Sequence, residues 1–298
     1  MAFKDTLRRG MTRATEPQVL FPLIALVLLA ATWGMAFSEI EVDTAAAEQA
    51  AAVSSRELLS TYEAQVVRAL REIDLTLTLV KHWPKSAGGR YRLEELKTKG
   101  LLPPDLLFVV SIAGRDGVIV ESTRAARVKQ RALDPDTFQQ IQASDNLIID
   151  RLPRGPTGEG KLNFSRRLIA ANGTFDGVVT VAIDANYFVS GYDITRLGKR
   201  GVLGLLGADG EFRVRRTGDA TFSGDVVDYA TAVSGDDDTP ATISRSSWDG
   251  EQRWTSAREL YGFPLAVLVG LSVDEQLAAV HAQAGLTGFG LAQPVSRL

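Results

Sequence analysis

Hydrophobic and polar positions follow different patterns in successive parts of the chain, and the first pattern predicts a membrane anchor. From Pro17 to Ser38, 22 consecutive residues carry no charge, which is enough for a helix across about 30 Å of hydrocarbon. Basic residues precede this run and acidic residues follow it. We therefore expect a cytoplasmic tail at 1–17, a transmembrane helix at 18–38 and an exported remainder. The length of the run favours an uncleaved anchor over a cleaved signal peptide.

The next pattern predicts a long helix over residues 40–84. No glycine or proline occurs from Thr44 to Trp83, and the apolar residues recur every three or four positions, as on one face of a helix. This stripe consists of Leu59, Tyr62, Val66, Leu70, Ile73, Leu77 and Val80. Because it drifts from strict heptads, we expect it to pack on a domain, with dimerisation along part of the same helix.

The remainder contains an internal repeat of β-hairpins. Apolar segments meet Asp116-Gly117 and Asp209-Gly210, 93 residues apart, and Asp-Gly favours a tight hairpin turn. A second hairpin follows each copy, and these hairpins cover 163–168 with 177–184, and 253–259 with 264–272. Each copy therefore predicts a four- or five-stranded antiparallel sheet, and the fold class is α+β. Between the first pair of hairpins, Asp134 or Asp136 is expected to cap a short helix.

Composition narrows the chemistry. The 298 residues include no cysteine and two histidines, and the net charge is −3. Disulfides, thiolate catalysis and cysteine zinc sites are therefore excluded, and nucleic acid is not expected as a partner. Residues 155–162 fall short of a P-loop because Leu162 replaces the magnesium-binding hydroxyl. Asp236–Asp238 are expected to form a solvated loop rather than a calcium site. We expect no catalytic residues, no metal and no cofactor.

Several segments together resemble the periplasmic double Cache sensor domain, which has two PAS-like modules in tandem beside a membrane-rooted helix. The resemblance covers about residues 40–282 and is strongest to the sensory halves of membrane-bound diguanylate cyclases of the GGDEF type. Histidine kinases and chemoreceptors resemble it more distantly. Besides the Asp-Gly hairpins, it rests on Phe164–Leu168, Asn172–Val179, Ile183–Phe188, Tyr261–Leu265 and Gly270–Ser272.

The resemblance implies a membrane-distal module at 85–195, which would hold a small ligand, and a membrane-proximal module at 196–282. The implied pocket comes from 108–122, 133–166 and 181–184. The Arg-x-Trp-Tyr signature of amino-acid-binding members is missing. Within the pocket, Arg166 and Asp184 are the best polar candidates, as a donor fork and a carboxylate on neighbouring strands. The alternative is that they are solvated, or paired with each other, on the sheet. The candidate ligand-binding residues are Arg166, Asp184, Phe138 and Ser165.

The end of the chain differs from that of a complete receptor. Residues 283–298 form an irregular tail rich in glycine, without a second apolar span or an output domain. This favours a truncated receptor over an anchored sensor that acts through a partner. We expect a single-pass inner-membrane protein with a periplasmic domain that binds a small molecule and couples it to signalling, of cyclic-di-GMP type in complete relatives. The alternatives are an anchored periplasmic enzyme or nucleotide-binding protein, the sensor domain of a histidine kinase or chemoreceptor, and an interaction module without ligand.

Overall fold

A computed structural model describes residues 17–85, 91–103, 107–152, 160–192, 194–233 and 241–278. Contacts divide the chain into two compact units, residues 1–50 with 276–298, and Ala51–Glu275. Four segments singled out in the sequence fall outside the described residues. These are residues 1–16 of the expected cytoplasmic tail, the tail at 283–298, Asp236–Asp238, and positions 155–159 of the glycine-rich loop.

The first unit contains the beginning of α2 (Pro17–His82), one continuous helix of 66 residues. The apolar side chains of Leu26, Leu29 and Trp33 are 67 %, 61 % and 59 % exposed. Among the described residues, no helix combines the length and the hydropathy that crossing a membrane requires.

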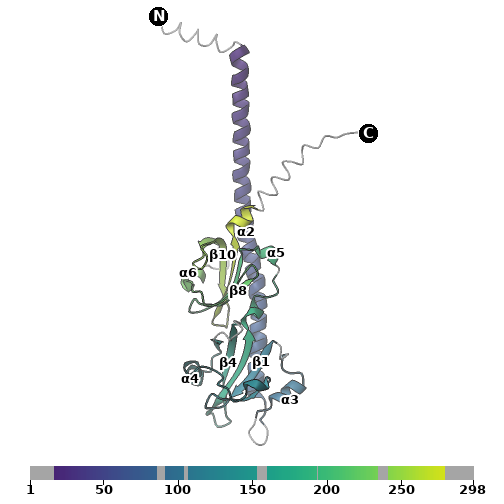
Figure 1. The fold of residues 1–298 in the computed structure, drawn as a ribbon, viewed down its shortest axis with the longest axis vertical. Coiled ribbons are helices and arrows are strands. Elements are labelled where there is room, and N and C mark those ends of the chain that lie inside the picture. The colour runs from purple at the N-terminus through teal and green to yellow at the C-terminus, as the bar shows by residue number, and fades with distance from the viewer. Residues whose placement is uncertain are drawn as a thin grey trace, which may run out of the picture. The chain divides into compact units, whose positions relative to one another are not determined.

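In the second unit, the rest of α2 lies alongside two antiparallel sheets (Figure 1). The apolar stripe predicted on this helix is buried and forms one core with both sheets. Its seven residues, from Leu59 to Val80, are at most 3 % exposed. Burial of each such side chain contributes about 1.5–3 kcal/mol. The stripe is therefore the face of α2 that packs on the sheets, as its departure from heptads predicted.

The first sheet follows α3 (Leu93–Thr98) and has the strand order β2-β1-β5-β4-β3. Its strands are β1 (Phe108–Ala113), β2 (Ile119–Ser122), β3 (Ile148–Leu152), β4 (Lys161–Ile169) and β5 (Phe175–Asp184). Two helical segments, η1 (Ala125–Arg127) and α4 (Pro135–Ala143), connect β2 to β3. Asp134 caps α4, because its carboxylate accepts hydrogen bonds from the backbone N–H of Asp136 and Thr137.

The second sheet has the strand order β8-β7-β6-β11-β10-β9, one strand more than we expected. It follows η2 (Ala185–Phe188) and α5 (Ile194–Leu197) in the chain, and α6 (Tyr229–Val233) lies in the connection from β8 to β9. Its strands are β6 (Val202–Gly207), β7 (Phe212–Thr217), β8 (Ala220–Phe222), β9 (Thr242–Arg245), β10 (Gln252–Glu259) and β11 (Leu265–Ser272). The chain is helical again from residue 273 to 278.

The two Asp-Gly turns have the same hydrogen bonds, which confirms the repeat. Gly117 and Gly210 have φ of 77° and 76°, in the left-handed region that glycine tolerates best. Asp116 and Asp209 each accept a hydrogen bond from the backbone N–H two residues ahead. When the two turns are aligned, β1 and β2 correspond to β6 and β7, and β4 and β5 correspond to β10 and β11.

Each sheet has one face against α2 and one face turned away from it. The faces against α2 share a single apolar core, whereas the other faces have separate small clusters. We call the face of the first sheet that is turned away from α2 the outer face of the first sheet, and name that of the second sheet likewise. A ligand site on either outer face depends on how completely its side chains fill the space.

Candidate functional site

Four hydroxyl groups form a row across the outer face of the first sheet. Directly opposite residues of neighbouring strands share a face, and the register pairs Ser122 with Ser111, Ser111 with Thr180, and Thr180 with Ser165. The hydroxyls of Ser111 and Ser122 are 2.8 Å apart. Ser111, Thr180 and Ser165 are at most 4 % exposed. Because buried polar groups in proteins are nearly always hydrogen-bonded, each of these hydroxyls needs a hydrogen-bond partner.

Three side-chain polar atoms of Asn163 and Ser165 on this face have none, and neither has the Nε of Arg167. Asn163 lies two residues before Ser165 on β4, and both residues are 1 % exposed. Neither the side-chain oxygen nor the nitrogen of Asn163 makes a hydrogen bond, nor does the Ser165 hydroxyl. An unsatisfied buried polar group costs about 1–3 kcal/mol. The amide and the hydroxyl together offer both donors and acceptors, which suits a polar ligand or ordered water.

Charged side chains lie at both ends of the same face. Lys161 and Asp184 are paired in the register at one end, and one Asp184 oxygen accepts a hydrogen bond of 2.9 Å from the backbone N–H of Asn186. This bond caps η2. Towards the other end, Arg167 is opposite Val178 and donates to the carbonyl of Gln142 at 3.4 Å. The polar row therefore lies between a lysine–carboxylate end and an arginine end.

Aromatic side chains enclose the arginine end. The ring of Phe138, on α4, meets that of Phe175 edge to face with centroids 5.8 Å apart. Both rings pack against the small cluster that includes Ile141 and Val178. Because Asp134 caps α4, this local hydrogen bonding holds Phe138 over the sheet. The outer face thus combines an apolar wall with a few polar groups, as small-molecule sites commonly do.

Arg166 and Asp184, the two polar candidates for one ligand site predicted from sequence, do not face the same side of the sheet. The two residues lie on neighbouring strands but on opposite faces, because Arg166 alternates with Ser165 along β4. The Arg166 Nε donates to Asp74 of α2 at 2.7 Å, and its Nη1 donates to the carbonyl of Asp145 at 3.0 Å. Arg166 is therefore partnered within the fold by Asp74, and the mutual pairing with Asp184 that we kept as an alternative does not occur either.

Sequence reasoning missed Asn163 and Arg167, although β4 contained the signal. In Lys161–Leu168, polar side chains occupy every second position through Arg167, and Leu162, Phe164 and Leu168 occupy the others. This alternation places Arg166 on the apolar face. A shift of one residue changes the face of every side chain on a strand. The arginine that shares a face with Ser165 is consequently Arg167.

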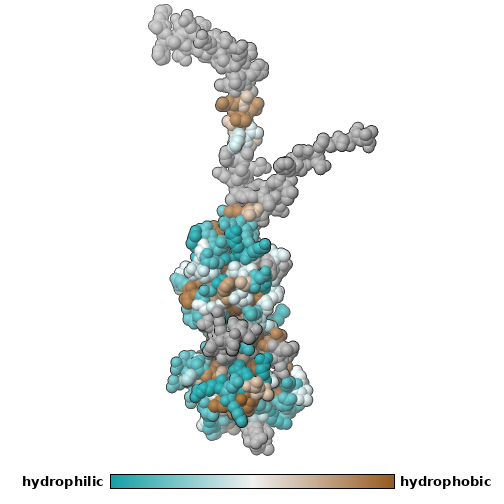
Figure 2. Space-filling model, viewed as in Figure 1, coloured by the Kyte–Doolittle hydropathy of each residue, from teal (hydrophilic) through white to brown (hydrophobic). Residues whose placement is uncertain are grey.

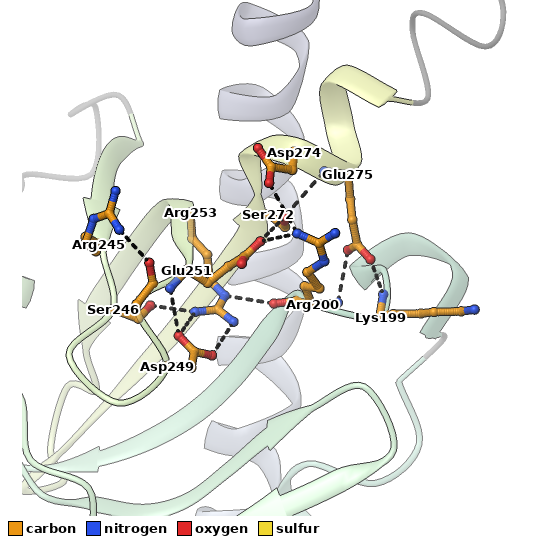
Figure 3. Close-up of polar contacts among 11 residues, drawn as sticks. Lys199, Arg200, Arg245, Ser246, Asp249, Glu251, Arg253, Ser272, Asp274 and Glu275 are labelled. Atoms are coloured by element: carbon orange, nitrogen blue, oxygen red, sulfur yellow. Dashed lines mark hydrogen bonds and ion pairs between the residues drawn. The ribbon is translucent and has the colours of Figure 1, made fainter.

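The corresponding outer face of the second sheet is filled. Arg253 is 1 % exposed, and its guanidinium forms two hydrogen bonds with Asp249, at 2.7 and 2.8 Å, as Figure 3 shows. It also donates to Ser246 and to the carbonyl of Arg200. Burial raises the pKa of Asp249, but the hydrogen bonds from Arg253 and from the backbone outweigh it and hold this pKa below its ordinary value. These groups satisfy one another and leave little for a ligand.

Two further observations bear on the chemistry. Among the described residues, no group of three or more histidine, cysteine or acidic side chains is arranged to hold a metal ion. Trp254 is 8 % exposed in the core shared with α2. Trp248 packs edge to face on Phe212 with ring centroids 5.1 Å apart, and its buried Nε1 has no hydrogen-bond acceptor.

No model of a protein family matches the chain, and no curated protein matches it. Solved structures do match. The extracellular domain of a protein described as a histidine kinase, rpHK1S-Z16, is 21 % identical with a TM-score of 0.54, and the match covers 74 % of this chain and 94 % of that one. The chain therefore shares the fold of this extracellular domain.

Two chemoreceptor domains also match. The ligand-binding domain of the amino acid chemoreceptor PctC of Pseudomonas aeruginosa PAO1, in complex with GABA, is 16 % identical with a TM-score of 0.46, over 72 % of this chain and 96 % of that one. The ligand-binding domain of Tlp3 of Campylobacter jejuni, in complex with L-norvaline, is 10 % identical with a TM-score of 0.46, over 85 % of this chain and 97 % of that one.

Proposed function

We propose that the chain is an extracytoplasmic sensor that binds a small polar molecule on the outer face of its first sheet and acts without chemical turnover. The proposal rests above all on the buried side chains of Asn163 and Ser165, three of whose polar atoms lack hydrogen-bond partners. The shared fold with the extracellular domain of a histidine kinase supports the same class of function.

The proposed site extends from Lys161 and Asp184, which lie opposite each other on β4 and β5, through the hydroxyl row, to Phe138. Ser165 and Asn163 would supply the central hydrogen bonds. Asp184 offers its carboxylate at the end of β5, where it also caps η2. A ligand that binds the Asp184 carboxylate would therefore compete with this cap and shift η2, which leads to the second sheet. Arg166 is assigned to the contact with α2.

A thermal-shift screen of the full chain against amino acids, amines, carboxylates and purines tests this function. For any compound that raises the melting temperature, Asn163→Leu is expected to abolish the shift. The same variant should leave the ligand-free protein as stable as before or more stable, because it removes an unsatisfied amide. The matched control is Thr255→Val, at the position of the second sheet that corresponds to Asn163; it should leave the ligand shift unchanged. An unchanged ligand shift in Asn163→Leu, or no active compound at all, contradicts the proposal.

We also propose that residues 18–38 anchor the protein in the inner membrane, with residues 1–17 in the cytoplasm and the sheets in the periplasm. The uncharged run and its flanking charges support this arrangement. Figure 2 shows a brown, hydrophobic band on the described N-terminal part of α2. In this part of the helix, Leu26 and Leu29 are 67 % and 61 % exposed. A reporter that is active only in the periplasm, fused after residue 282, is expected to be active; a silent fusion contradicts the topology.

The output is proposed to be a conformational signal, of cyclic-di-GMP type in complete relatives, transmitted by a homodimer through α2. A groove of about 950 Å³ beside the helix supports the dimer. It has apolar lining residues, among which Leu75 is 69 % exposed and Leu101 is 44 % exposed. Sedimentation of the full chain in detergent should give the mass of a dimer, and Leu75→Asp should shift it towards a monomer. A monomer at all protein concentrations rejects this part.

A further inference from the structure

We infer a second binding site, for a small molecule that carries a phosphate or carboxylate group, in the groove where α2 meets α5 and β10. The groove has a volume of about 610 Å³, and three of its seven lining residues are arginines. It is separate from the outer face of the first sheet, so this inference goes beyond the proposed sensor function. The residues that line it are Val53, Arg56, Glu57, Ser60, Thr61, Arg196 and Arg258.

The charges in the groove do not balance. Arg258 binds Glu63 of α2 with an Nη1–Oε2 distance of 2.6 Å, and both side chains are 26 % exposed. Arg196 reaches Glu57 only at 4.0 Å, where both side chains are more than half exposed. Glu63 thus compensates the charge of Arg258, and Glu57 compensates that of Arg196 weakly. The charge of Arg56 has no carboxylate partner among the described residues.

Arg56 is the residue that points to a ligand. It is half-buried on α2, and its Nε–H is hidden from water without an acceptor. Within the described ranges, Arg56 forms no ion pair. A buried charged donor without an acceptor is costly, and this one stands in a protein whose net charge is −3. A free positive charge in an acidic protein favours a bound anion.

The chemistry of the lining defines the class of ligand. A guanidinium presents a planar set of donors that matches a phosphate or a carboxylate. Ser60 is exposed in the same groove, one helical turn after Arg56, and can donate a further hydrogen bond. An anion between Arg56 and Arg196 would join α2 to the segment that leads into the second sheet.

The test uses the full chain in neutral detergent, with inorganic phosphate and succinate as probes and sodium chloride at equal ionic strength as reference. At least one probe should raise the melting temperature above the chloride reference. The probe that does so tells a phosphate ligand from a carboxylate ligand. Arg56→Gln should weaken its binding, measured by calorimetry, by about tenfold or more.

Two matched variants sharpen the test. Arg131→Gln removes the same charge at an exposed position outside this groove and outside the proposed dimer groove, and it should leave binding unchanged. Glu57→Gln removes a carboxylate that competes for Arg196, and it should strengthen binding. No stabilisation above chloride, or equal losses in Arg56→Gln and Arg131→Gln, overturns the site. So does an effect of Arg56→Gln on oligomeric state alone, because Arg56 would then pair with a second copy of the chain.

Discussion

Five strands have the same order in both sheets, to which the second sheet adds β8. The two sheets differ in what fills their outer faces. On the first sheet, one row across four strands reads Ser122, Ser111, Thr180 and Ser165. The corresponding row on the second sheet reads Arg215, Gly204, Leu268 and Ala257. A Cβ atom at Gly204 would overlap the ring of Phe212, so the glycine makes room for that ring. Four small hydroxyls are thus replaced by a close-packed cluster.

The corners of the two outer faces differ in the same way. Lys161 and Asp184 are paired at the end of the first sheet, and Arg253 and Ser272 occupy the corresponding positions on the second. Arg253 is buried and fully engaged by Asp249 and Ser246, whereas Lys161 forms no ion pair among the described residues. The comparison shows that the strand order is shared and that the side chains decide which polar groups stay unsatisfied: those of Asn163 and Ser165 on the first outer face, and the indole N–H of Trp248 on the second.

The largest expected effect comes from emptying the filled face. Phe212→Ala leaves a cavity beside Gly204 and Trp248, and should lower the free energy of unfolding by about 3–5 kcal/mol. Thr180→Val, the matched change in the hydroxyl row, should cost about 1 kcal/mol or less. Denaturant titration of both variants measures the difference. Equal losses would mean that the first outer face is packed as tightly as the second.

The second largest effect should be the difference in unfolding free energy between variants of Arg253 and Lys161, which occupy corresponding corners of the two sheets. Arg253→Met leaves Asp249 and Ser246 without their buried partner, and should cost about 3 kcal/mol. Lys161→Met is the control, because Lys161 is only partly buried; it should cost less than about 1 kcal/mol. Both values come from equilibrium unfolding in urea. A cost of Lys161→Met as large as that of Arg253→Met would end the distinction between the two corners.

The smallest effect is the pH dependence of the Arg253–Asp249 pair. The folded pKa of Asp249 is held below its ordinary value of 3.8, so its stabilising contribution is present above that value and is lost as the pH falls through the folded pKa. Wild type should therefore exceed Asp249→Asn in stability at neutral pH, and the gap should narrow on acidification to about pH 3. Thermal melts across this range measure the gap. A gap that stays constant would show that Asp249 contributes through its shape rather than its charge.

Much of the framework could be predicted because its determinants are local. The 3.6-residue periodicity from Leu59 to Val80 predicted the buried face of α2, and Asp116-Gly117 and Asp209-Gly210 predicted the two hairpins. The cap of α4 by Asp134 also follows from neighbouring residues. β8 was missed because it is only three residues long and entirely exposed, and therefore has no alternating pattern.

The candidate site was predicted less completely, since it depends on which residues meet across strands. Ser165, Asp184 and Phe138 do lie on or over one face of the first sheet. Arg166 does not, because its neighbour on the chain, Ser165, already occupies that face. The alternation of β4 showed the face on which Asn163 lies, but its lack of hydrogen-bond partners was not visible in the sequence, since an asparagine in a strand is costly only when burial removes its partners.

The sequence by itself determined the helical stripe, the repeated hairpins and a chemistry without thiols or paired histidines, because these depend on residue types and on neighbours in the chain. Only the tertiary structure decided that Arg166 binds Asp74 and that Arg56 has no acceptor. It also decided that an apolar cluster and a fully bonded Arg253 fill one outer face, while buried hydroxyls and the unsatisfied amide of Asn163 occupy the other. These outcomes depend on strand register and on burial, both of which arise only when distant segments pack together.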